Sequence, residues 1–203
     1  MIPNGVDAKA FGKAASKKLA RDKLGLDQDA FVVGHVGRFD PAKNHGTILN
    51  VFRRVASRIE NARFVFCGLG TDSSGFRSLV KESGLDNRTL CLGTHDDVPS
   101  VLASFDLFYF PSVTEGQPNA LIEAMIAGLP VITSDIPPIR EAVPEEMHAR
   151  LIDPMDAEAA EQVILALHDD MELREAYKCR EWAIDRYDAE KNFKLFADVL
   201  LAR

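Results

Sequence analysis

Residues 107–134 read LFYFPSVTEGQPNALIEAMIAGLPVITS. An apolar run of strand length, residues 107–110, opens this stretch, and a second, residues 131–134, closes it. Between them, residues 118–127 have the apolar character of a buried helix. Strands that read as continuous apolar runs and are separated by helices are typical of a parallel sheet covered on both faces. The stretch therefore predicts one strand–helix–strand unit of an α/β domain.

The same stretch carries two carboxylates eight positions apart, Glu115 and Glu123. Glu123 is the only charged residue between Gly116 and Ser134. Burial of a lone carboxylate costs several kcal/mol unless it is hydrogen-bonded or paired. Two interpretations follow. Glu123 either meets an Arg or surfaces at a cleft wall, or it lies at the rim of a pocket and accepts hydrogen bonds from ligand hydroxyls.

The residues that lead into this helix favour a ligand. Pro118 suits the first helical position, where a missing N–H costs nothing. Asn119 and Ala120 then fall in the first turn, whose N–H groups have no intrahelical partner and attract anions, phosphate above all. A phosphate site followed one turn later by a carboxylate suits a nucleotide or a nucleotide sugar.

The rest of the chain up to residue 155 repeats the alternation of strands and helices, which predicts a doubly wound parallel sheet of the Rossmann-like type. The further strands expected are residues 31–36, 63–67, 89–92 and, as a sixth strand, 149–152. The further helices expected are residues 48–59, 76–83 and 98–103.

From residue 156 onward the chain reads as helices only, over residues 157–167, 173–184 and 190–201. We therefore predict one nucleotide-sugar-binding domain over residues 1–203. Residues 1–30 form its leading segment and residues 156–203 its helical part. Phe193, Phe196, Leu200 and Leu201 recur at helical spacing. This last helix either closes the domain's own core or crosses to a partner domain.

Three further loops follow predicted strands, at the edge of the sheet where such folds bind ligands. Residues 37–45 supply Gly37, Arg38 and Lys43, and these two cations suit phosphate oxygens. Residues 68–70 read Gly-Leu-Gly, but Ser73 replaces the third glycine of a dinucleotide fingerprint, so we expect a plain tight turn. Residues 93–97 carry polar groups that suit a base.

Composition excludes several classes of protein. The chain is 46% hydrophobic and 27% charged, with a net charge of −7, which argues against a large nucleic-acid footprint. The three cysteines form no CxxC pair and the five histidines have no metal-ligand spacing, so we expect neither a metal nor a disulfide. Met1 leads directly into Ile-Pro-Asn-Gly, and no run approaches the about 20 apolar residues that span a bilayer. We expect a cytoplasmic protein.

Taken in order, these motifs resemble the C-terminal, donor-binding half of family 4 glycosyltransferases with the GT-B fold, most closely the capsular and exopolysaccharide type. The resemblance covers about nine tenths of the chain. The residues that carry it are 2–7 (the interdomain crossing), 36–38, Lys43, 67–70, 92–93, Asp106, 111–112, Glu115, Glu123 and 128–131.

The resemblance assigns roles. Arg38 and Lys43 would neutralise the donor diphosphate, Glu115 would contact the transferred sugar, and Glu123 would bind ribose hydroxyls. Phosphate would be held by backbone N–H groups of Gly116, Gln117, Asn119 and Ala120. The base would be bordered by Leu92, Gly93, Thr94 and His95.

The chain departs from the family pattern at three places. Thr71 stands where the family often has proline, after Gly-Asp/Glu-Gly, and Tyr187-Asp188-Ala189 replaces the usual Ser/Trp before the last helix. The N-terminal, acceptor-binding Rossmann-like domain of a GT-B enzyme is missing. The resemblance therefore implies the donor domain of a retaining, metal-independent hexosyltransferase that uses a UDP- or GDP-sugar and no cofactor. The isolated domain would be inactive.

Two alternatives stay open at this point. One is a non-catalytic nucleotide-sugar-binding module, and the other is a fragment of a GT-B-like sugar-nucleotide epimerase or phosphorylase. The pairing of both glutamates with Arg38 and Lys43 favours the transferase. The sequence also leaves open a peripheral position of the full enzyme at the inner face of the membrane.

Overall fold

The computed structural model describes residue 3 and residues 5–201. Five parallel strands form one sheet in the order β3-β2-β1-β4-β5. The strands are β1 (Phe31–Val36), β2 (Ala62–Cys67), β3 (Thr89–Cys91), β4 (Leu107–Phe110) and β5 (Val131–Thr133). Every residue of β1, β4 and β5 is buried, as continuous apolar runs require. The predicted doubly wound α/β fold is confirmed.

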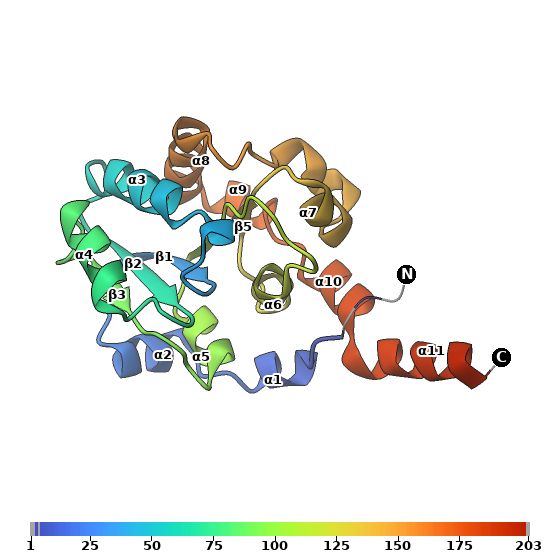
Figure 1. Cartoon of the computed structure of the whole chain (residues 1–203). Coiled ribbons are helices and arrows are strands. Elements are labelled where there is room, and N and C mark those ends of the chain that lie inside the picture. Colours follow the sequence, from blue (N-terminus) through green and yellow to red (C-terminus); the bar gives the residue numbers. More distant parts are fainter. Residues whose placement is uncertain (1–2, 4, 202–203) are drawn as a thin grey trace.

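Helices cover both faces of the sheet, with α3 on one side and α2 and α5 on the other (Figure 1). The helices up to residue 142 are α1 (Ala8–Gly12), α2 (Lys17–Leu24), α3 (His45–Ala56), α4 (Ser74–Glu82), α5 (Val98–Ala103), α6 (Asn119–Ile126) and α7 (Pro137–Ala142). Those that follow are α8 (Ala157–Asp169), α9 (Met171–Glu175), α10 (Arg180–Tyr187) and α11 (Ala189–Leu201). In the tertiary structure α3 packs on α8, and α6 packs on α10.

Two expected elements differ from the structure. The sixth strand is wrong: residues 145–150 form a 3-10 helix, and only Ile152 bridges Ser134 beyond β5. The single helix expected over residues 173–184 is also wrong, because it is split into α9 and α10. Tyr177 lies between these two helices, and its carbonyl accepts a hydrogen bond from the Val131 N–H at 3.1 Å, at the edge of the sheet.

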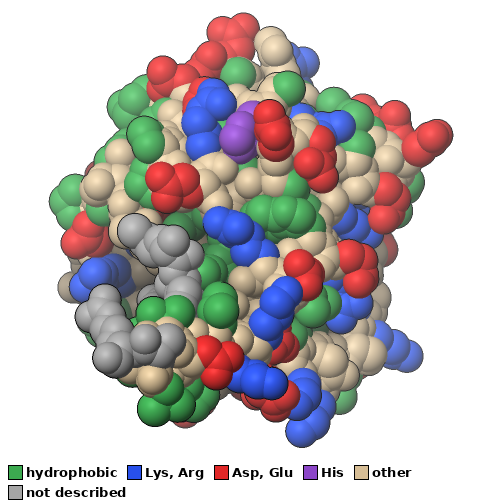
Figure 2. Space-filling model, turned by 90° about the vertical axis from the view of Figure 1, so that its right-hand side faces the viewer, with side chains coloured by type: hydrophobic (Ala, Val, Ile, Leu, Met, Phe, Trp, Pro, Cys, Tyr) green, Lys and Arg blue, Asp and Glu red, His purple; other side chains and the backbone are tan. Residues whose placement is uncertain are grey.

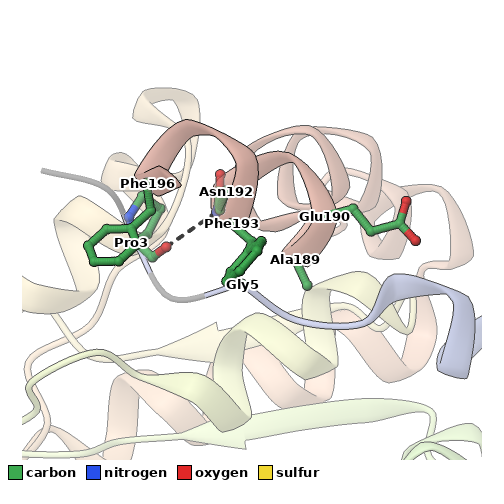
Figure 3. Close-up of a pocket in the computed structure, with 7 residues that line it drawn as sticks. All are labelled: Pro3, Gly5, Ala189, Glu190, Asn192, Phe193 and Phe196. Carbon is green, nitrogen blue, oxygen red and sulfur yellow. Dashed lines mark hydrogen bonds between the residues drawn. The ribbon is translucent and has the colours of Figure 1, made fainter. Parts of the chain in front are cut away.

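The last helix does not close the domain's core, so that interpretation is wrong. In α11 only Asn192 is buried, and Phe193 is 74% exposed. The helix projects from the body of the molecule beside the N-terminal segment (Figure 1). Asn192 donates to the Pro3 carbonyl at 3.3 Å, and an open groove of about 670 Å³ runs between that segment and Phe193 and Phe196 (Figure 3).

The N-terminal segment around Val6 and the segment that joins α10 to α11 lie side by side. Val6 forms a parallel bridge with Asp188, and its N–H donates to the Tyr187 carbonyl at 2.7 Å. Of the predicted interdomain crossing, Ile2 and Asn4 lie outside the described residues. No helix in the described part of the chain is long and apolar enough to cross a bilayer. Acidic and basic side chains are interspersed over the face from which α11 projects (Figure 2).

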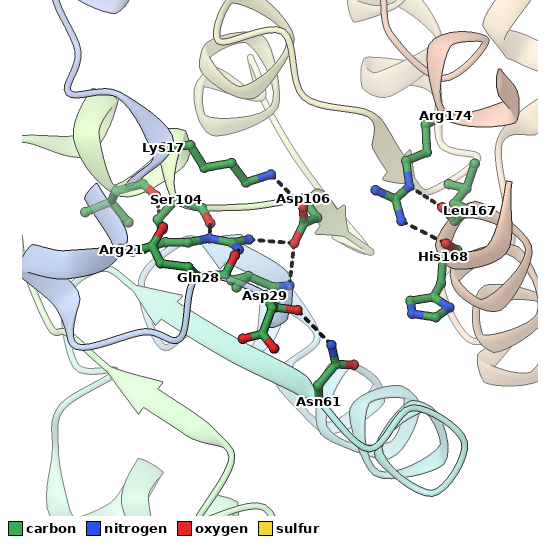
Figure 4. Close-up of polar contacts among 12 residues, drawn as sticks. Lys17, Arg21, Gln28, Asp29, Asn61, Ser104, Asp106, Leu167, His168 and Arg174 are labelled. Atoms are coloured by element: carbon green, nitrogen blue, oxygen red, sulfur yellow. Dashed lines mark hydrogen bonds and ion pairs between the residues drawn. The ribbon is translucent and has the colours of Figure 1, made fainter. Parts of the chain in front are cut away.

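A buried ion cluster joins β1, β4 and α2 at the amino ends of the two strands (Figure 4). The Asp106 carboxylate accepts hydrogen bonds from Arg21 at 2.7 Å, from Lys17 at 2.5 Å and from the Val32 N–H at 2.7 Å. Arg21, which is 3% exposed, also donates to the carbonyls of Ser104 and Gln28. Burial alone would raise the pKa of Asp106, but the hydrogen bonds from Lys17 and Val32 and the charges of Lys17 and Arg21 hold it below its usual range.

Replacement of Asp106 by Asn should destabilise the fold by about 3–5 kcal/mol, the usual cost of removing one partner from a buried ion pair. The Asn amide would turn N–H groups toward cationic donors and leave the Arg21 charge uncompensated. Urea unfolding at pH 7 measures the loss. Lys17→Met is the control, because the Lys17 side chain is 47% exposed and should contribute at most about 1 kcal/mol. Equal losses for the two variants would contradict this account of the cluster.

Candidate functional site

The order of the strands places a topological switch point between β1 and β4. From β1 the chain moves to β2 on one side, and from β4 it moves to β5 on the other. Open α/β sheets bind ligands outside the carboxyl ends of strands at such a point, because the two loops diverge there and leave a crevice. The loop after β1 contains Arg38 and Lys43, and the loop after β4 contains Glu115. The topology therefore brings three predicted site residues to one place.

Direct hydrogen bonds tie these two loops together. The Val113 N–H donates to the Ala42 carbonyl at 2.9 Å. The Asn44 side chain donates to the carbonyls of Pro111 at 3.2 Å and Pro154 at 2.8 Å. Asn44 has φ +57°, a left-handed conformation that asparagine tolerates better than most residues. These hydrogen bonds hold the two loops against each other.

The loops after β2 and β3 join the same edge. A Cβ on Gly68 would lie 2.4 Å from the Gly37 carbonyl oxygen, so only glycine permits this approach of two backbones. The Thr71 hydroxyl donates to the Gly68 carbonyl at 3.0 Å and accepts from the Gly93 N–H at 3.1 Å. Thr71, where the family often has proline, therefore links the tight turn after β2 to the loop that starts at Leu92.

Lys43 and Glu115 form an ion pair across the crevice. Their side chains are only 17% and 8% exposed, and the Lys43 ammonium also lies 5.1 Å from the centre of the Phe110 ring. In the absence of a ligand, Glu115 thus neutralises one of the two cations predicted to bind phosphate. Arg38 is exposed and has no ion-pair partner within residues 3 and 5–201.

The predicted phosphate-binding turn starts one residue later than expected. Pro118 is the N-cap of α6 and supplies no side-chain cap, and Asn119 is the first helical residue. The Asn119 N–H already donates to the Gln117 carbonyl at 2.9 Å. The Gln117 side chain donates to the Asn119 side chain at 3.1 Å. Gly116, exposed at the crevice, and Ala120, in the first turn, complete this segment.

Glu123 lies one turn into α6 and lines a cavity of about 350 Å³ with Asn119, Val98, Asp7 and Phe11. Burial raises the pKa of the Glu123 carboxyl. No Arg or other partner for this carboxylate is found among the described residues, so the internal Arg pair is wrong, whereas a position at a cavity wall agrees both with the cleft-wall alternative and with a ligand site. A half-buried carboxylate without a partner that faces a cavity is suited to accept hydrogen bonds from ligand hydroxyls.

Part of this cavity was not predicted. Asp7 is the N-cap of α1 and Phe11 lies within it, and α1 is a short helix in the leading segment. The available signal was Asp7 itself, a favoured N-cap residue, whose carboxylate accepts from the Lys9 N–H at 3.0 Å.

The predicted base loop leads into the same cavity. Gly93 is buried, Thr94 is exposed, and Leu92 and His95 are half-buried. The His95 Nδ1 accepts from the Asp97 N–H at 3.1 Å, and Val98, which follows directly, lines the Glu123 cavity. Within the described residues, no three His, Cys, Asp or Glu side chains come together as metal ligands.

Two buried histidines lie beneath the loop after β1. His45 begins α3, and its ring lies 5.1 Å from that of His35 and 5.3–5.4 Å from those of Phe76 and Phe39. His35 Nδ1 contacts the Tyr109 carbonyl at 3.0 Å, whereas His35 Nε2 has no partner in the described structure. Burial lowers the pKa of His35 to about 3 and that of His45 to about 4. Both rings are therefore neutral at pH 7.

Comparisons with known proteins agree with this fold. Residues 16–181 match the family described as glycosyl transferases group 1. The chain is 31% identical over 206 residues to the UDP-Gal:alpha-D-GlcNAc-diphosphoundecaprenol alpha-1,3-galactosyltransferase of Escherichia coli, covering 99% of this chain and 53% of that protein. It is 27% identical over 204 residues to a Campylobacter jejuni protein, covering 100% of this chain and 51% of the relative. The latter is an N-acetylgalactosamine-N,N'-diacetylbacillosaminyl-diphospho-undecaprenol 4-alpha-N-acetylgalactosaminyltransferase.

Among solved structures, Anabaena HepE in complex with UDP and glucose superposes with a TM-score of 0.86 at 23% identity, covering all of this chain and 56% of that one. This likeness shows the fold. The chain spans about half the length of these relatives.

Acid should destabilise the protein well before its carboxylates titrate, because of His35 and His45. Below the unfolded histidine pKa of about 6.5, the unfolded chain binds protons that the folded chain refuses until pH 3–4. Each histidine should therefore cost about 1.4 kcal/mol of stability per pH unit in that window. His45→Phe, which suits the aromatic surroundings, should roughly halve the slope measured by urea unfolding between pH 6 and pH 4.5. His148→Gln, a control at a partly exposed histidine, should leave the slope unchanged. An unaltered slope in His45→Phe would contradict the assignment.

Proposed function

Because the chain belongs to the group 1 glycosyl transferases, we propose that it is the donor-binding half of a retaining, metal-independent glycosyltransferase. The whole protein would transfer a hexosyl unit in the synthesis of surface polysaccharides or glycoconjugates. The observation that carries this proposal is the Lys43–Glu115 pair at the switch point, together with Glu123 one turn into α6, which has no partner among the described residues. Glu115 for the sugar, Lys43 for the diphosphate and Glu123 for the ribose would then cover three successive parts of a nucleotide sugar.

The donor diphosphate would lie between the loop after β1 and the first turn of α6. Arg38 offers a planar fork of donors to phosphate oxygens, and Lys43 offers a point charge. The uncapped start of α6 adds its partial positive charge. When the bond between sugar and diphosphate breaks, these groups stabilise the charge that develops on the leaving diphosphate. We propose that they replace a divalent metal ion in this role.

The nucleoside would extend toward α5. Glu123 would accept hydrogen bonds from the ribose hydroxyls, and Leu92–His95 would border the base. The E. coli relative uses UDP-Gal by name, and HepE was solved with UDP, which supports a UDP-sugar as donor. Diphosphoundecaprenol-linked sugars in the names of both relatives support a lipid-linked diphosphate acceptor.

The acceptor would be held mainly by a second α/β domain, which together with this chain would complete the enzyme. The exposed apolar side chains of α11 beside the chain entry support contact with such a domain. The free thiols of Cys67, Cys91 and Cys179 support a reducing compartment, and we propose a cytoplasmic location.

The test of this proposal is the titration of UDP into the chain, with and without magnesium, using the Glu123→Gln variant. The unmodified chain should bind UDP without magnesium. Loss of a charge-assisted acceptor should weaken UDP binding by about 1 kcal/mol or more, whereas 2′-deoxy-UDP should be affected less. Fold stability should fall little, because no internal cation depends on Glu123.

Glu158→Gln, at an exposed position of α8, is the matched control and should change neither quantity. If Glu123→Gln keeps its UDP affinity but loses much of its fold stability, the assignment of Glu123 to the ribose hydroxyls is wrong. Absence of UDP, GDP and ADP binding at millimolar concentration would sink the proposed function.

The ligand-free ion pair leads to a second expectation. Glu115→Gln should tighten UDP binding by about 1 kcal/mol, because the carboxylate no longer competes with phosphate for the Lys43 ammonium. The gain should be smaller for a UDP-hexose, which loses its contact with Glu115. In a Lys43→Ala background the same exchange should have little effect, and calorimetry of the four combinations measures the coupling. A gain that persists without Lys43 would show simple repulsion between Glu115 and phosphate instead.

A further inference from the structure

A second cavity adjoins the loop that leads into α6, on the opposite side from Glu123. Its volume is about 190 Å³, and its walls include Gln117, Pro118, Glu141, Arg186 and Tyr187. The Glu123 cavity, by contrast, lies against α1 and α5. Figure 1 shows α6 between α5 on one side and α7 and α10 on the other. The loop around Gly116, which is assigned to the donor sugar and phosphate, therefore lines this second cavity, whereas Asn119 and Glu123 of α6 line the first.

Arg186 is the cation of this second cavity. Its guanidinium lies 5.5 Å from the centre of the Trp182 ring and 5.8 Å from that of Tyr187. The Tyr187 hydroxyl is fixed in turn by the Ala142 carbonyl at 3.2 Å. Two aromatic rings thus hold the guanidinium in place through cation–π contacts. A cation held in this way loses little conformational entropy when it binds an anion.

No carboxylate neutralises Arg186 in the described part of the chain. Glu141 shares the cavity but does not pair with it. Arg140, on the same α7 as Glu141, does have a partner, because it forms a two-pronged ion pair with Asp135. The contrast between the two arginines indicates that Arg186 is left available for a ligand.

The chemistry of the walls selects the class of ligand. Arg186 suits phosphate oxygens, and the uncapped first turn of α6, which starts after Pro118, adds positive potential. Glu141, on another wall of the cavity, suits hydroxyl donors. The volume holds one phosphate and part of a sugar ring, but it is too small for a nucleotide.

We propose that Arg186 determines acceptor specificity by binding the phosphate of a glycosyl phosphate or diphosphate acceptor beside the loop that holds the donor sugar. This inference rests on the proposed function for the identity of the ligand as acceptor. It adds a contact from the donor-binding half to a substrate otherwise assigned to the other domain.

The test uses the chain itself, first saturated with UDP so that Arg38 and Lys43 are occupied. α-D-N-acetylglucosamine 1-phosphate is then titrated, and amide chemical shifts are followed by NMR. We expect shifts around Gly116 and Arg186 that saturate. Arg186→Ala should weaken this binding at least fivefold and leave the UDP affinity unchanged. Arg186→Lys should restore part of it, since lysine keeps the charge without the planar fork.

Arg140→Ala is the matched control, because it removes an arginine of equal charge whose side chain is committed to Asp135. Inorganic phosphate, titrated in parallel, should bind more weakly than the glycosyl phosphate. It lacks the sugar hydroxyls, which would donate hydrogen bonds to the Glu141 carboxylate. Equal binding of the two probes would reduce the site to a phosphate site and overturn the acceptor assignment.

Unchanged binding in Arg186→Ala, or an equal loss in Arg140→Ala, would also overturn the proposal. If UDP itself fails to bind, the proposed function fails, and the titration without UDP still reports on Arg186. The two failures are therefore distinguishable.

Discussion

The pairing of β1 with β4 is the constraint on which the rest of the structure depends. Val33 and Gly34 lie beside Leu107 and Phe108, although residues 37–106 separate the two strands. A Cβ on Gly34 would lie 2.0 Å from the Phe105 ring, so the absence of a side chain lets the end of α5 approach the sheet. Asp106 closes the amino end of the same seam, where its N–H donates to the Val32 carbonyl while its carboxylate accepts from the Val32 N–H. Once this seam is fixed, the loops at the opposite ends of the two strands must meet.

The candidate site is a consequence of that meeting. Lys43 and Glu115 belong to different strand–helix units, and each would be a costly charge in its half-buried place without the other. Their pairing holds the two loops of the crevice together. Glu123 has no such partner among the described residues, and its carboxylate remains turned to a cavity. The site therefore contains one carboxylate paired with a cation and one without a partner among the described residues.

Prediction from sequence succeeded where burial is set locally. The strands 31–36 and 107–110 and the helix 98–103 agree with the structure because uninterrupted apolar runs and an Asp97 N-cap define them. Prediction failed where a distant partner decides. The expected helix is interrupted where the Tyr177 carbonyl accepts a hydrogen bond from the Val131 N–H at the edge of the sheet. The sixth strand is reduced to a bridge at Ile152 because residues 145–150 turn in a 3-10 helix.

The sequence by itself determined the α/β class, the positions of Arg38, Lys43 and Glu115 in loops after strands and of Glu123 in the following helix, and the family resemblance. Periodicity and loop chemistry are local properties, so a single chain read in order reveals them. Only the tertiary structure decided that Lys43 pairs with Glu115, that α1 walls the Glu123 cavity, and that, among the described residues, Arg140 has a carboxylate partner and Arg186 has none. Those facts depend on which side chains meet across the fold. The energy of a charge depends on its neighbours in space, which the order of residues does not specify.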